Sequence, residues 1–239
     1  MSVIELRSHM DVELIQHMGS DASVVWAARV STKGQQSLDD LDADPAAAKG
    51  LINFLMKNRH GTPFEHNAFT FFVRAPIFVF REFHRHRIGF SYNEESGRYK
   101  QLDPVFYVPG ADRALIQVGR PGHYEFVPGT SEQLAREIER DSRSYQLAYD
   151  TYEESLADGV AKEVARTKLP VATYSSMYVT CNARSLMSFL SLRTKREGSR
   201  FPSFPQREIE MVAEQMEALW AEKMPMIYES FNLNGRVSP

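Results

Sequence analysis

The chain has 239 residues, 43% of them hydrophobic and 25% charged, and a formal net charge of −3. These proportions are ordinary for a globular protein. The slight acidity argues against a general nucleic-acid-binding protein, because non-specific affinity for DNA rests on an excess of Lys and Arg. The single cysteine, Cys181, excludes an intrachain disulfide and a cysteine-cluster site, and no H-E-x-x-H motif occurs, so we expect no bound metal.

The first part of the chain is predicted to mix short strands with helices. Ser20 or Asp21 suits a helix N-cap, Pro45 suits a first helical turn, and Gly89 suits a helix end. The TPFE segment has a capping-box pattern, but β-favouring residues follow it, which predicts a single turn. In chain order we expect a strand at 3–7, a helix at 20–31, an acidic loop at 34–45, a helix at 45–58, a turn at 62–65, a strand at 67–73 and a helix at 75–87.

The second part is predicted to contain the two longest helices, both with apolar stripes. Their apolar residues could serve the core or contacts between subunits: Leu134, Ile138, Tyr145 and Leu147 in one, and Ile209, Val212, Met216 and Leu219 in the other. In chain order we expect a strand at 104–110, an irregular segment at 119–130, helices at 131–156 and 162–168, a strand at 173–181, a helix at 183–193, a loop at 195–205 and a helix at 207–224.

This order of elements lacks regular βαβ alternation and therefore predicts an α+β fold. We expect one domain over residues 1–239, with a mixed or antiparallel sheet flanked by long helices. Residues 1–19 and 232–239 are expected to be peripheral, and the C-terminal tail frayed. Neither a G-x-G-x-x-G nor a P-loop motif occurs, so any nucleotide must occupy a non-Rossmann pocket.

Two further features bear on where the protein works. Charges are scattered through the N-terminal segment, unlike a signal peptide, and no stretch has the apolar length of a membrane span. We therefore expect a cytoplasmic protein with no membrane partner.

The most informative segment is RHRIGFSYNEESGRY (85–99), which gathers cations, carboxylates, small polar groups and aromatic rings. The arginine side chain presents a planar fork of donors that matches phosphate and carboxylate. The carboxylates and the amide of Asn93 suit the edge of a nucleobase. A helix end with solvated arginines is the structural alternative, but the density of mixed donors, acceptors and rings favours a ligand site.

Several other segments occur with it in a fixed order along the chain. They are HGTPFEH (60–66), APIFVFREFHRHR (75–87), SGRY (96–99), EVARTKLP (163–170) and NARSLMSFLSLR (182–193). Together with R-H-R and its following serine, they resemble the flavin-dependent thymidylate synthases, the ThyX family. The resemblance covers the chain from about residue 20 to about residue 230.

The resemblance implies a methyltransferase of dTMP biosynthesis that carries out the reductive methylation of dUMP to dTMP. Methylenetetrahydrofolate would supply the carbon, NADPH the reducing equivalents, and FAD the redox relay. It further implies a homotetramer in which each active site is shared between chains.

The resemblance also implies the site residues. Arg193 matches an arginine that faces the uracil and is the catalytic candidate. The dUMP contacts would be Glu82, Arg85, Glu94, Ser96, Arg98, Arg166 and Arg193. The FAD contacts would be His60, Thr62, Arg85, His86, Arg87, Glu94, Asn182, Ala183 and Arg184.

Physical chemistry supports several of these roles. Arg98 suits the 5′-phosphate, and a fixed cation at Arg193 would favour the N3-deprotonated, more nucleophilic pyrimidine. Ser96 has no His/Asp relay nearby in the sequence, so we interpret it as a binding residue and not a nucleophile. Cys181 is interpreted as a small packing residue, because the family uses no cysteine nucleophile.

Each candidate also has a structural alternative. Thr62 and Glu65 could simply cap a helix, and arginines at helix ends offset the macrodipole. His60 could be an ordinary surface histidine, and we leave His66 as structural. Arg166 alone would be a solvated side chain.

Three features depart from the family pattern. Glu82 stands where some relatives have a glutamine that contacts dUMP, so that contact changes its sign or is lost. Ser188 stands where relatives often have Asn or His near FAD. The 194–205 loop is longer than in compact relatives.

Two rival functions remain open. The chain could be a nucleotide-binding flavoprotein that has lost methylation through Glu82 or Ser188. It could also be a nucleic-acid-binding module that clamps a backbone with RHR and GRY, although its charge and dispersed arginines disfavour this.

Overall fold

The computed structural model describes residues 2–37, 45–120 and 123–239. By contact density the chain divides into two compact units. The first comprises Met1–Met10, Arg74–Arg81 and Glu94–Ser176, and the second Asp11–Val73, Glu82–Asn93 and Met177–Pro239. The chain passes from one unit to the other several times, at residues 10–11, 73–74, 81–82, 93–94 and 176–177. The single domain expected over residues 1–239 stays a prediction.

The second unit is built on a four-stranded sheet in the order β2 (Asp11–Met18), β3 (Ala68–Pro76), β8 (Tyr174–Cys181), β4 (Phe90–Glu94). The last residues of β3 and β4 and the first of β8 belong to the first unit. Along β3 the residues alternate, with Phe69, Phe71 and Val73 fully buried. This period of two turns one face of the central strand toward a hydrophobic core.

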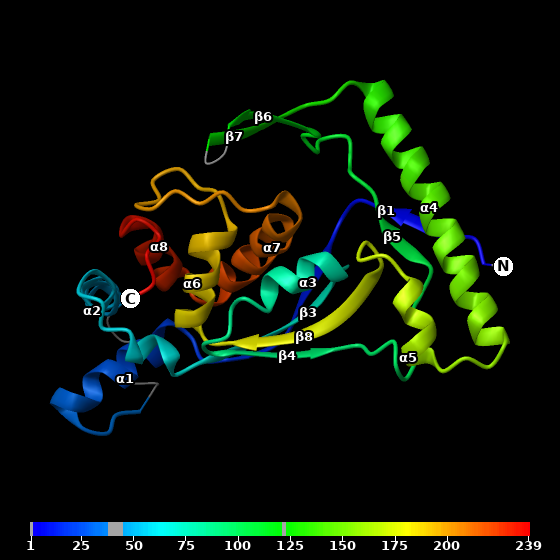
Figure 1. The fold of residues 1–239 in the computed structure, drawn as a ribbon. Helices are drawn as coiled ribbons and strands as arrows, with labels where there is room; N and C mark the ends of the chain where they lie inside the picture. The colour runs from blue at the N-terminus through cyan, green and yellow to red at the C-terminus, as the bar shows by residue number, and fades with distance from the viewer. Residues whose placement is uncertain (1, 38–44, 121–122) are drawn as a thin grey trace. The chain divides into compact units, whose positions relative to one another are not determined.

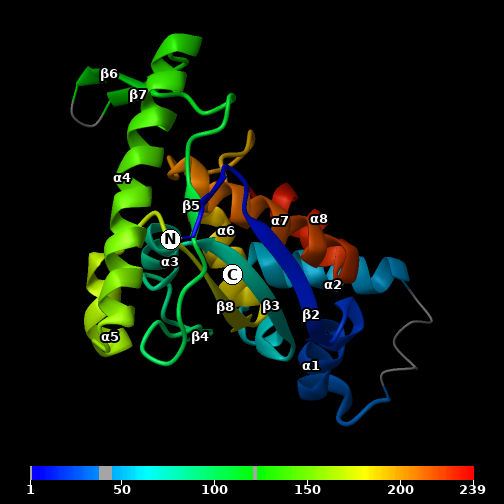
Figure 2. The same ribbon diagram turned by 90° about the vertical axis from the view of Figure 1, so that its right-hand side faces the viewer.

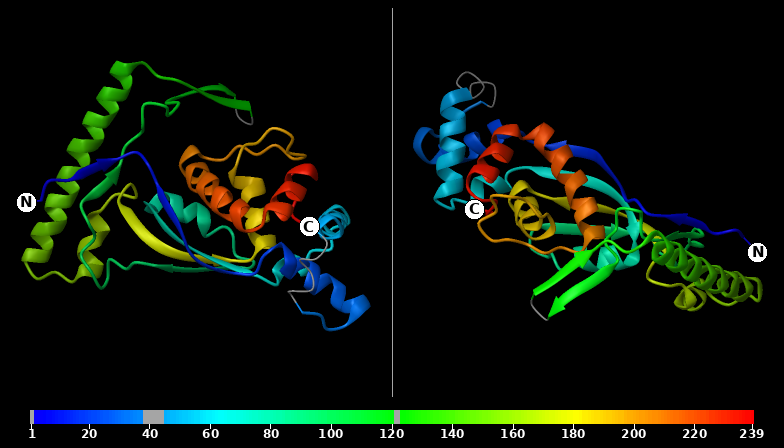
Figure 3. Two further views of the ribbon diagram at one scale, coloured as in Figure 1. Left: turned by 180° about the vertical axis from the view of Figure 1, so that it is seen from behind. Right: turned by 90° about the horizontal axis from the view of Figure 1, so that it is seen from above.

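Helices complete that core (Figures 1 and 3). They are α1 (Asp21–Lys33), α2 (Pro45–Lys57), α6 (Ala183–Arg193), α7 (Arg207–Lys223) and α8 (Pro225–Leu233), with the short 3₁₀ helix η2 (Thr62–Glu65). Contacts join α6 to α7, α7 to β2, and α2 to α8. The buried side chains they contribute include Ile52, Leu186, Phe189, Ile209, Val212, Met216, Trp220 and Phe231.

The first unit centres on α4 (Ser131–Ala157), which packs beside β1 (Glu5–Arg7) and β5 (Val105–Tyr107) (Figure 2). These two strands pair in parallel. Phe106 of β5 packs on Tyr149 and Tyr152 of α4, all three fully buried. The unit also contains β6 (Ile116–Arg120) paired antiparallel with β7 (His123–Val127), the short helix α5 (Lys162–Ala165) and the 3₁₀ helix η3 (Arg166–Lys168).

The mixed α+β character is confirmed, and so are most predicted elements, including the single turn at 62–65. The acidic loop expected at 34–45 lies largely outside the described residues. The irregular segment expected at 119–130 is wrong, because β6 and β7 form a hairpin there. Val118, Tyr124 and Phe126 favour a strand, and the pairing of the two strands supplies the backbone hydrogen bonds.

The helix expected at 75–87 is shorter than predicted: α3 spans only Ile77–Phe83. The carbonyl oxygens of Phe83 and His86 lie 2.8 and 2.6 Å from the hydroxyl of Tyr92, and the Phe83 carbonyl also accepts the N–H of His86 in a last turn. Gly89, with φ of +69°, then turns the chain into β4. The R-H-R triplet therefore lies after the helix and not on it.

The frayed C-terminal tail is also wrong. After α8 ends, Gly235 donates its N–H to the carbonyl of Asn232, and Arg236 donates its N–H to that of Phe231. The Arg236 side chain is only 4% exposed. Tertiary contacts of this arginine, not local sequence, order the tail.

Candidate functional site

The residues predicted to contact dUMP and FAD fall in both units. Glu94, Ser96, Arg98 and Arg166 belong to the first unit, and the others belong to the second.

In the first unit, the turn after β4 forms a polar cluster. The Ser96 hydroxyl accepts the N–H of Arg98 at 3.2 Å, which shapes the turn, and the exposed Arg98 guanidinium pairs with Glu163 at 2.8 Å. Gly97 is buried, and a Cβ there would stand 3.2 Å from Cδ of Arg166. The absence of a side chain at Gly97 thus lets Arg166 approach the turn.

This turn brings together three of the predicted dUMP residues: it carries Ser96 and Arg98, and the side chain of Arg166 packs against it at Gly97. Such a set of donors suits a phosphate. Arg98 pairs with Glu163 through Nε, so a bound phosphate would share this guanidinium with the carboxylate.

The carboxylate of Glu94, at the end of β4, is held by the neighbouring strand. The hydroxyl of Ser175 on β8 donates to its carboxylate at 3.0 Å. The next carboxylate, Glu95, accepts from Ser176 and pairs with Lys100, both at 3.2 Å. Two adjacent carboxylates are thus held by two adjacent serines of the neighbouring strand.

In the second unit, Arg193 at the end of α6 is the centre of a polar cluster. Its Nη1 pairs with Glu82 at 2.5 Å, and its Nε donates to Nε2 of His86 at 3.0 Å. The Arg193 side chain is 17% exposed. Glu82 and His86 lie on either side of the end of α3, so the early end of that helix positions both partners.

The ring of His86 is enclosed by aromatic side chains. Its centroid lies 4.9 Å from that of Phe189 in an edge-on contact and 6.0 Å from that of Phe90. Burial first, and then the charge of Arg193, lower the pKa of His86 to about 4. The imidazole is therefore neutral near pH 7, and Nε2 is the acceptor that the Arg193 Nε–H requires.

Arg85 and Arg87, which flank His86, are both exposed. The structure thus separates the triplet: the histidine is directed into the protein, and the arginines face outward, free to reach a ligand.

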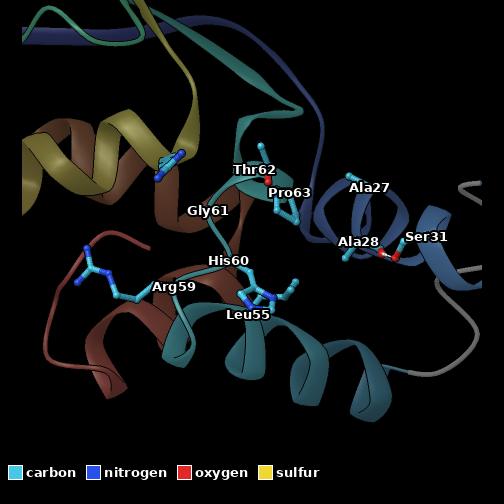
Figure 4. A pocket seen from close by; sticks show the side chains of 10 residues that line it. Ala27, Ala28, Ser31, Leu55, Arg59, His60, Gly61, Thr62 and Pro63 are labelled. Atoms are coloured by element: carbon cyan, nitrogen blue, oxygen red, sulfur yellow. Dashed lines mark hydrogen bonds between the residues drawn. The ribbon is translucent and has the colours of Figure 1, made fainter.

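The residues 60–63 and 184 line a second feature of this unit, a cavity of about 470 Å³ (Figure 4). One wall is formed by η2 and the residues before it, and another by Ala27, Ala28 and Ser31 of α1. The guanidinium of Arg184 packs directly against Gly61, where any Cβ would collide with it. Arg184 also pairs with Glu65 at 2.6 Å and donates to the main-chain oxygen of Pro239 at 2.8 Å.

The start of α6 is joined to η2 by a residue that sequence analysis missed. Asn67, 4% exposed, accepts the N–H of Ala183 at 2.7 Å and donates to the carbonyl of Phe64 at 3.0 Å. Asn182 caps α6 by accepting the N–H of Ser185 at 2.9 Å. The Ala183 N–H is therefore already engaged. The sequence signal was a polar asparagine placed between HGTPFEH and an apolar strand segment, although nothing local shows its partner.

Cys181 precedes this cap and is 3% exposed. Burial raises the pKa of its thiol, which opposes formation of a thiolate. Within the part of the chain that the structure describes, no cluster of three or more His, Cys, Asp or Glu side chains could hold a metal ion. Among the same residues, none of the helices is long and apolar enough to cross a membrane.

Comparison with known proteins identifies the class of enzyme to which these clusters belong. Residues 13–226 match the model of the family described as "Thymidylate synthase complementing protein". The chain is similar to the flavin-dependent thymidylate synthase of Streptomyces avermitilis, with 63% identity over 98% of this chain and 95% of the relative. It is also similar to that of Tropheryma whipplei, with 54% identity over 97% and 96% of the two chains.

A solved structure shares the whole fold. The UMP/dUMP methylase PolB from Streptomyces cacaoi, bound to 5-Br UMP, superposes with a TM-score of 0.92 at 51% identity, covering 100% of both chains. The chain therefore belongs to the flavin-dependent thymidylate synthase family, as its motifs predicted. It is a flavin-dependent methyltransferase.

Proposed function

We propose that this chain catalyses the reductive methylation of dUMP to dTMP, with FAD as redox cofactor, methylenetetrahydrofolate as carbon donor and NADPH as reductant. The observation that carries the proposal is the Arg193 cluster, in which a nearly buried guanidinium is held by Glu82 and His86. Family membership over residues 13–226 supplies the reaction class.

The residues of this chain would first bind and orient the nucleotide. Arg98, Arg166 and the hydroxyl of Ser96 are suited to the 5′-phosphate, because all three lie at one turn. The Nη2 of Arg193 lies 3.5 Å from the main-chain oxygen of Glu82. The other N–H of Nη2 would be directed to the uracil, where a held positive charge stabilises the electron-rich pyrimidine. Glu82 would accept from Arg193 and limit how far the guanidinium can turn.

The size and lining of the cavity at residues 60–63 can be compared with what a flavin nucleotide needs. A volume of about 470 Å³ lies within the range of roughly 300–1,000 Å³ typical of small-molecule sites. Arg59 and Arg184 on its wall would complement a diphosphate, and Gly61 permits a close approach of backbone and guanidinium. These residues fit part of such a cofactor, in a pocket without a Rossmann fingerprint.

We assign His60, Thr62 and Arg184 to holding the FAD at this cavity, with Arg85, His86, Arg87, Glu94, Asn182 and Ala183 as further contacts. For Ala183 the contact would be through atoms other than its N–H, which Asn67 occupies. When bound, FAD supplies the two-electron chemistry that no side chain of the protein provides.

We further propose a homotetramer in which each active site takes residues from more than one chain. The face of α4 supports this, because Leu147 is 68% exposed and Ile138 only partly buried within its own chain. For α7 the structure supports the other alternative, a role in the core, because Ile209, Val212 and Met216 are fully buried inside the chain.

The test is to purify the protein, record its visible spectrum and supply NADPH, methylenetetrahydrofolate and dUMP. We expect a bound flavin, its bleaching by NADPH in the presence of dUMP, and formation of dTMP. A flavin that is bleached without formation of dTMP would favour a nucleotide-binding flavoprotein that has lost methylation. A colourless protein that retains nucleic acid would favour the nucleic-acid-binding module.

Methylation of UMP is a second candidate, because the structural neighbour is a UMP/dUMP methylase. Parallel reactions with UMP separate the two. If UMP is methylated as fast as dUMP, the enzyme is not specific for the deoxynucleotide.

A further inference from the structure

We propose that Arg236, in the C-terminal segment, is a positioning residue that holds Arg193 in its working place through Thr194. The inference rests on the proposed role of Arg193 in binding the uracil. Arg236 itself would touch neither nucleotide nor cofactor.

Arg236 is held by three side chains. Its Nη1 donates to Glu217 of α7 at 2.6 Å and to Asn232 at 2.5 Å, and its Nη2 donates to Oγ1 of Thr194 at 2.9 Å. Both Arg236 and Glu217 have side chains only 3% exposed. The guanidinium thus joins the C-terminal segment, α7 and the end of α6.

Thr194 follows Arg193 directly and is 1% exposed. Its N–H and its hydroxyl both donate to the carbonyl of Leu190, at 3.1 and 2.7 Å. Its own carbonyl accepts from Ser203 at 2.6 Å. With Arg236 on the hydroxyl as well, Thr194 is bound on every polar atom, so its backbone, and the Cα of Arg193 beside it, has little freedom to shift.

Hydrogen bonds of the same region also hold the 194–205 loop. Arg200 donates its N–H to the carbonyl of Gly235 at 2.9 Å, and Lys195 donates its N–H to Glu210 at 2.8 Å. Arg196 lies 3.4 Å from the second carboxylate oxygen of Glu217. The C-terminal segment and the loop therefore hold one another.

Two physical features indicate that Arg236 does more than stabilise the fold. A buried ion pair such as Arg236–Glu217 is weak as a source of stability, because desolvation offsets the attraction, but it selects one geometry. Arg236 also has φ of +58°, a left-handed conformation that a non-glycine residue adopts at a cost. Strain of this kind persists where surrounding contacts over-determine it, often near functional sites.

The variant Arg236→Gly tests the inference, because it removes the guanidinium and relaxes the backbone at once. Thr194→Val removes only the hydroxyl, whereas Thr194→Ser keeps it. The measurement is the dissociation constant of dUMP from the FAD-loaded protein by calorimetry, in the parent and in an Arg193→Ala background.

We expect Arg236→Gly and Thr194→Val each to weaken dUMP binding about tenfold in the parent. In the Arg193→Ala background the same changes should weaken it by less than about twofold, because sites that act through one another are not additive. Thr194→Ser should bind dUMP like the parent. Thr151→Val is the matched control, since its hydroxyl makes the same bond to the carbonyl four residues earlier, in α4.

An equal loss in both backgrounds would show a general structural role and overturn the inference. So would parent-like binding by both Arg236→Gly and Thr194→Val. If Arg236→Gly does not fold, Thr194→Val gives the answer. Failure of the parent protein to bind dUMP would instead contradict the proposed function.

Discussion

At the scale of single residues, the role proposed for Arg193 depends on how its guanidinium is restrained. An arginine at the end of a helix is usually mobile and solvated, but here a carboxylate and a neutral imidazole each bind one edge of the guanidinium. A preorganised charge needs no reorganisation when electron density builds on a ligand, and this is why it is effective in catalysis.

We expect Arg193→Ala to lower the rate of dTMP formation by about a hundredfold or more, because a held charge is lost from the site. The fold should survive, since the guanidinium is not part of the hydrophobic core. Turnover is measured at saturating dUMP, with Arg140→Ala, another helix arginine, as control. Near-parent turnover would refute the assignment.

His86 predicts a dependence of stability on pH. Its pKa is about 4 in the folded protein against 6.5 for the free side chain, so the unfolded chain binds the proton more readily. The stability that depends on neutral His86 is therefore complete above about pH 6.5 and is lost as the pH falls toward about 4. Urea unfolding of the parent should show a smaller free energy of unfolding at pH 5 than at pH 7.

His86→Asn should lose less stability over that pH interval, because the titrating group is gone. His84→Asn, a change at an exposed neighbour, should behave like the parent. Identical pH dependence in the parent and in His86→Asn would show that His86 does not couple protonation to folding.

The buried thiol of Cys181 should be dispensable for turnover. Burial raises its pKa, and the thiol is therefore a poor nucleophile. We expect Cys181→Ala and Cys181→Ser to retain dTMP formation. A folded, FAD-loaded variant without activity, or a trapped adduct of Cys181 with the nucleotide, would count against a mechanism without a protein thiolate.

At the scale of elements, the Asn67 side chain links η2, which lines the cavity, to α6, the helix that carries Arg193. Asn67 bonds both the first N–H of α6 and a carbonyl of η2. The asparagine thus links the two elements through a hydrogen bond to each.

Asn67→Ala should lower the free energy of unfolding by about 2–4 kcal/mol, because it strands a buried donor and a buried acceptor. Asn67→Asp keeps the acceptor for Ala183 and should lose less. Asn58→Ala removes a bond to the carbonyl of Phe54 at an exposed position and should cost under about 1 kcal/mol. Equal losses of unfolding free energy in Asn67→Ala and Asn58→Ala would contradict the idea that Asn67 links η2 to α6.

At the scale of the whole molecule, the two long helices have different surroundings. The apolar face of α7 is buried within its own chain, whereas α4 buries Tyr149 and Tyr152 but leaves Leu147 exposed. The exposed face of α4 is thus the better candidate for contacts between subunits.

Subunit exchange tests whether the active sites are shared. We expect Arg98→Ala and Arg87→Ala each to be inactive and their mixture to regain part of the activity, because some mixed sites contain both arginines. Sedimentation should show a tetramer that FAD stabilises by mass action. A monomer that binds FAD and makes dTMP would exclude shared sites.

Features that depend on local pattern or on family motifs could be predicted from the sequence. The helices α1, α4 and α6 follow from apolar spacing, and the start of α1 follows from its cap Ser20, whose effect is confined to one turn. The family, and with it the reaction class, follows from motif residues in a fixed order.

The remaining features depend on partners that no local pattern shows. Glu82 and His86 bind Arg193 from about a hundred residues away, and Asn67 occupies the N–H of Ala183. Arg236 orders a tail that local composition makes look frayed. These hydrogen bonds join residues far apart in the chain, for which neither periodicity nor composition carries a signal. Within a shorter stretch, the Tyr92 hydroxyl lies against the carbonyls of Phe83 and His86, where α3 ends.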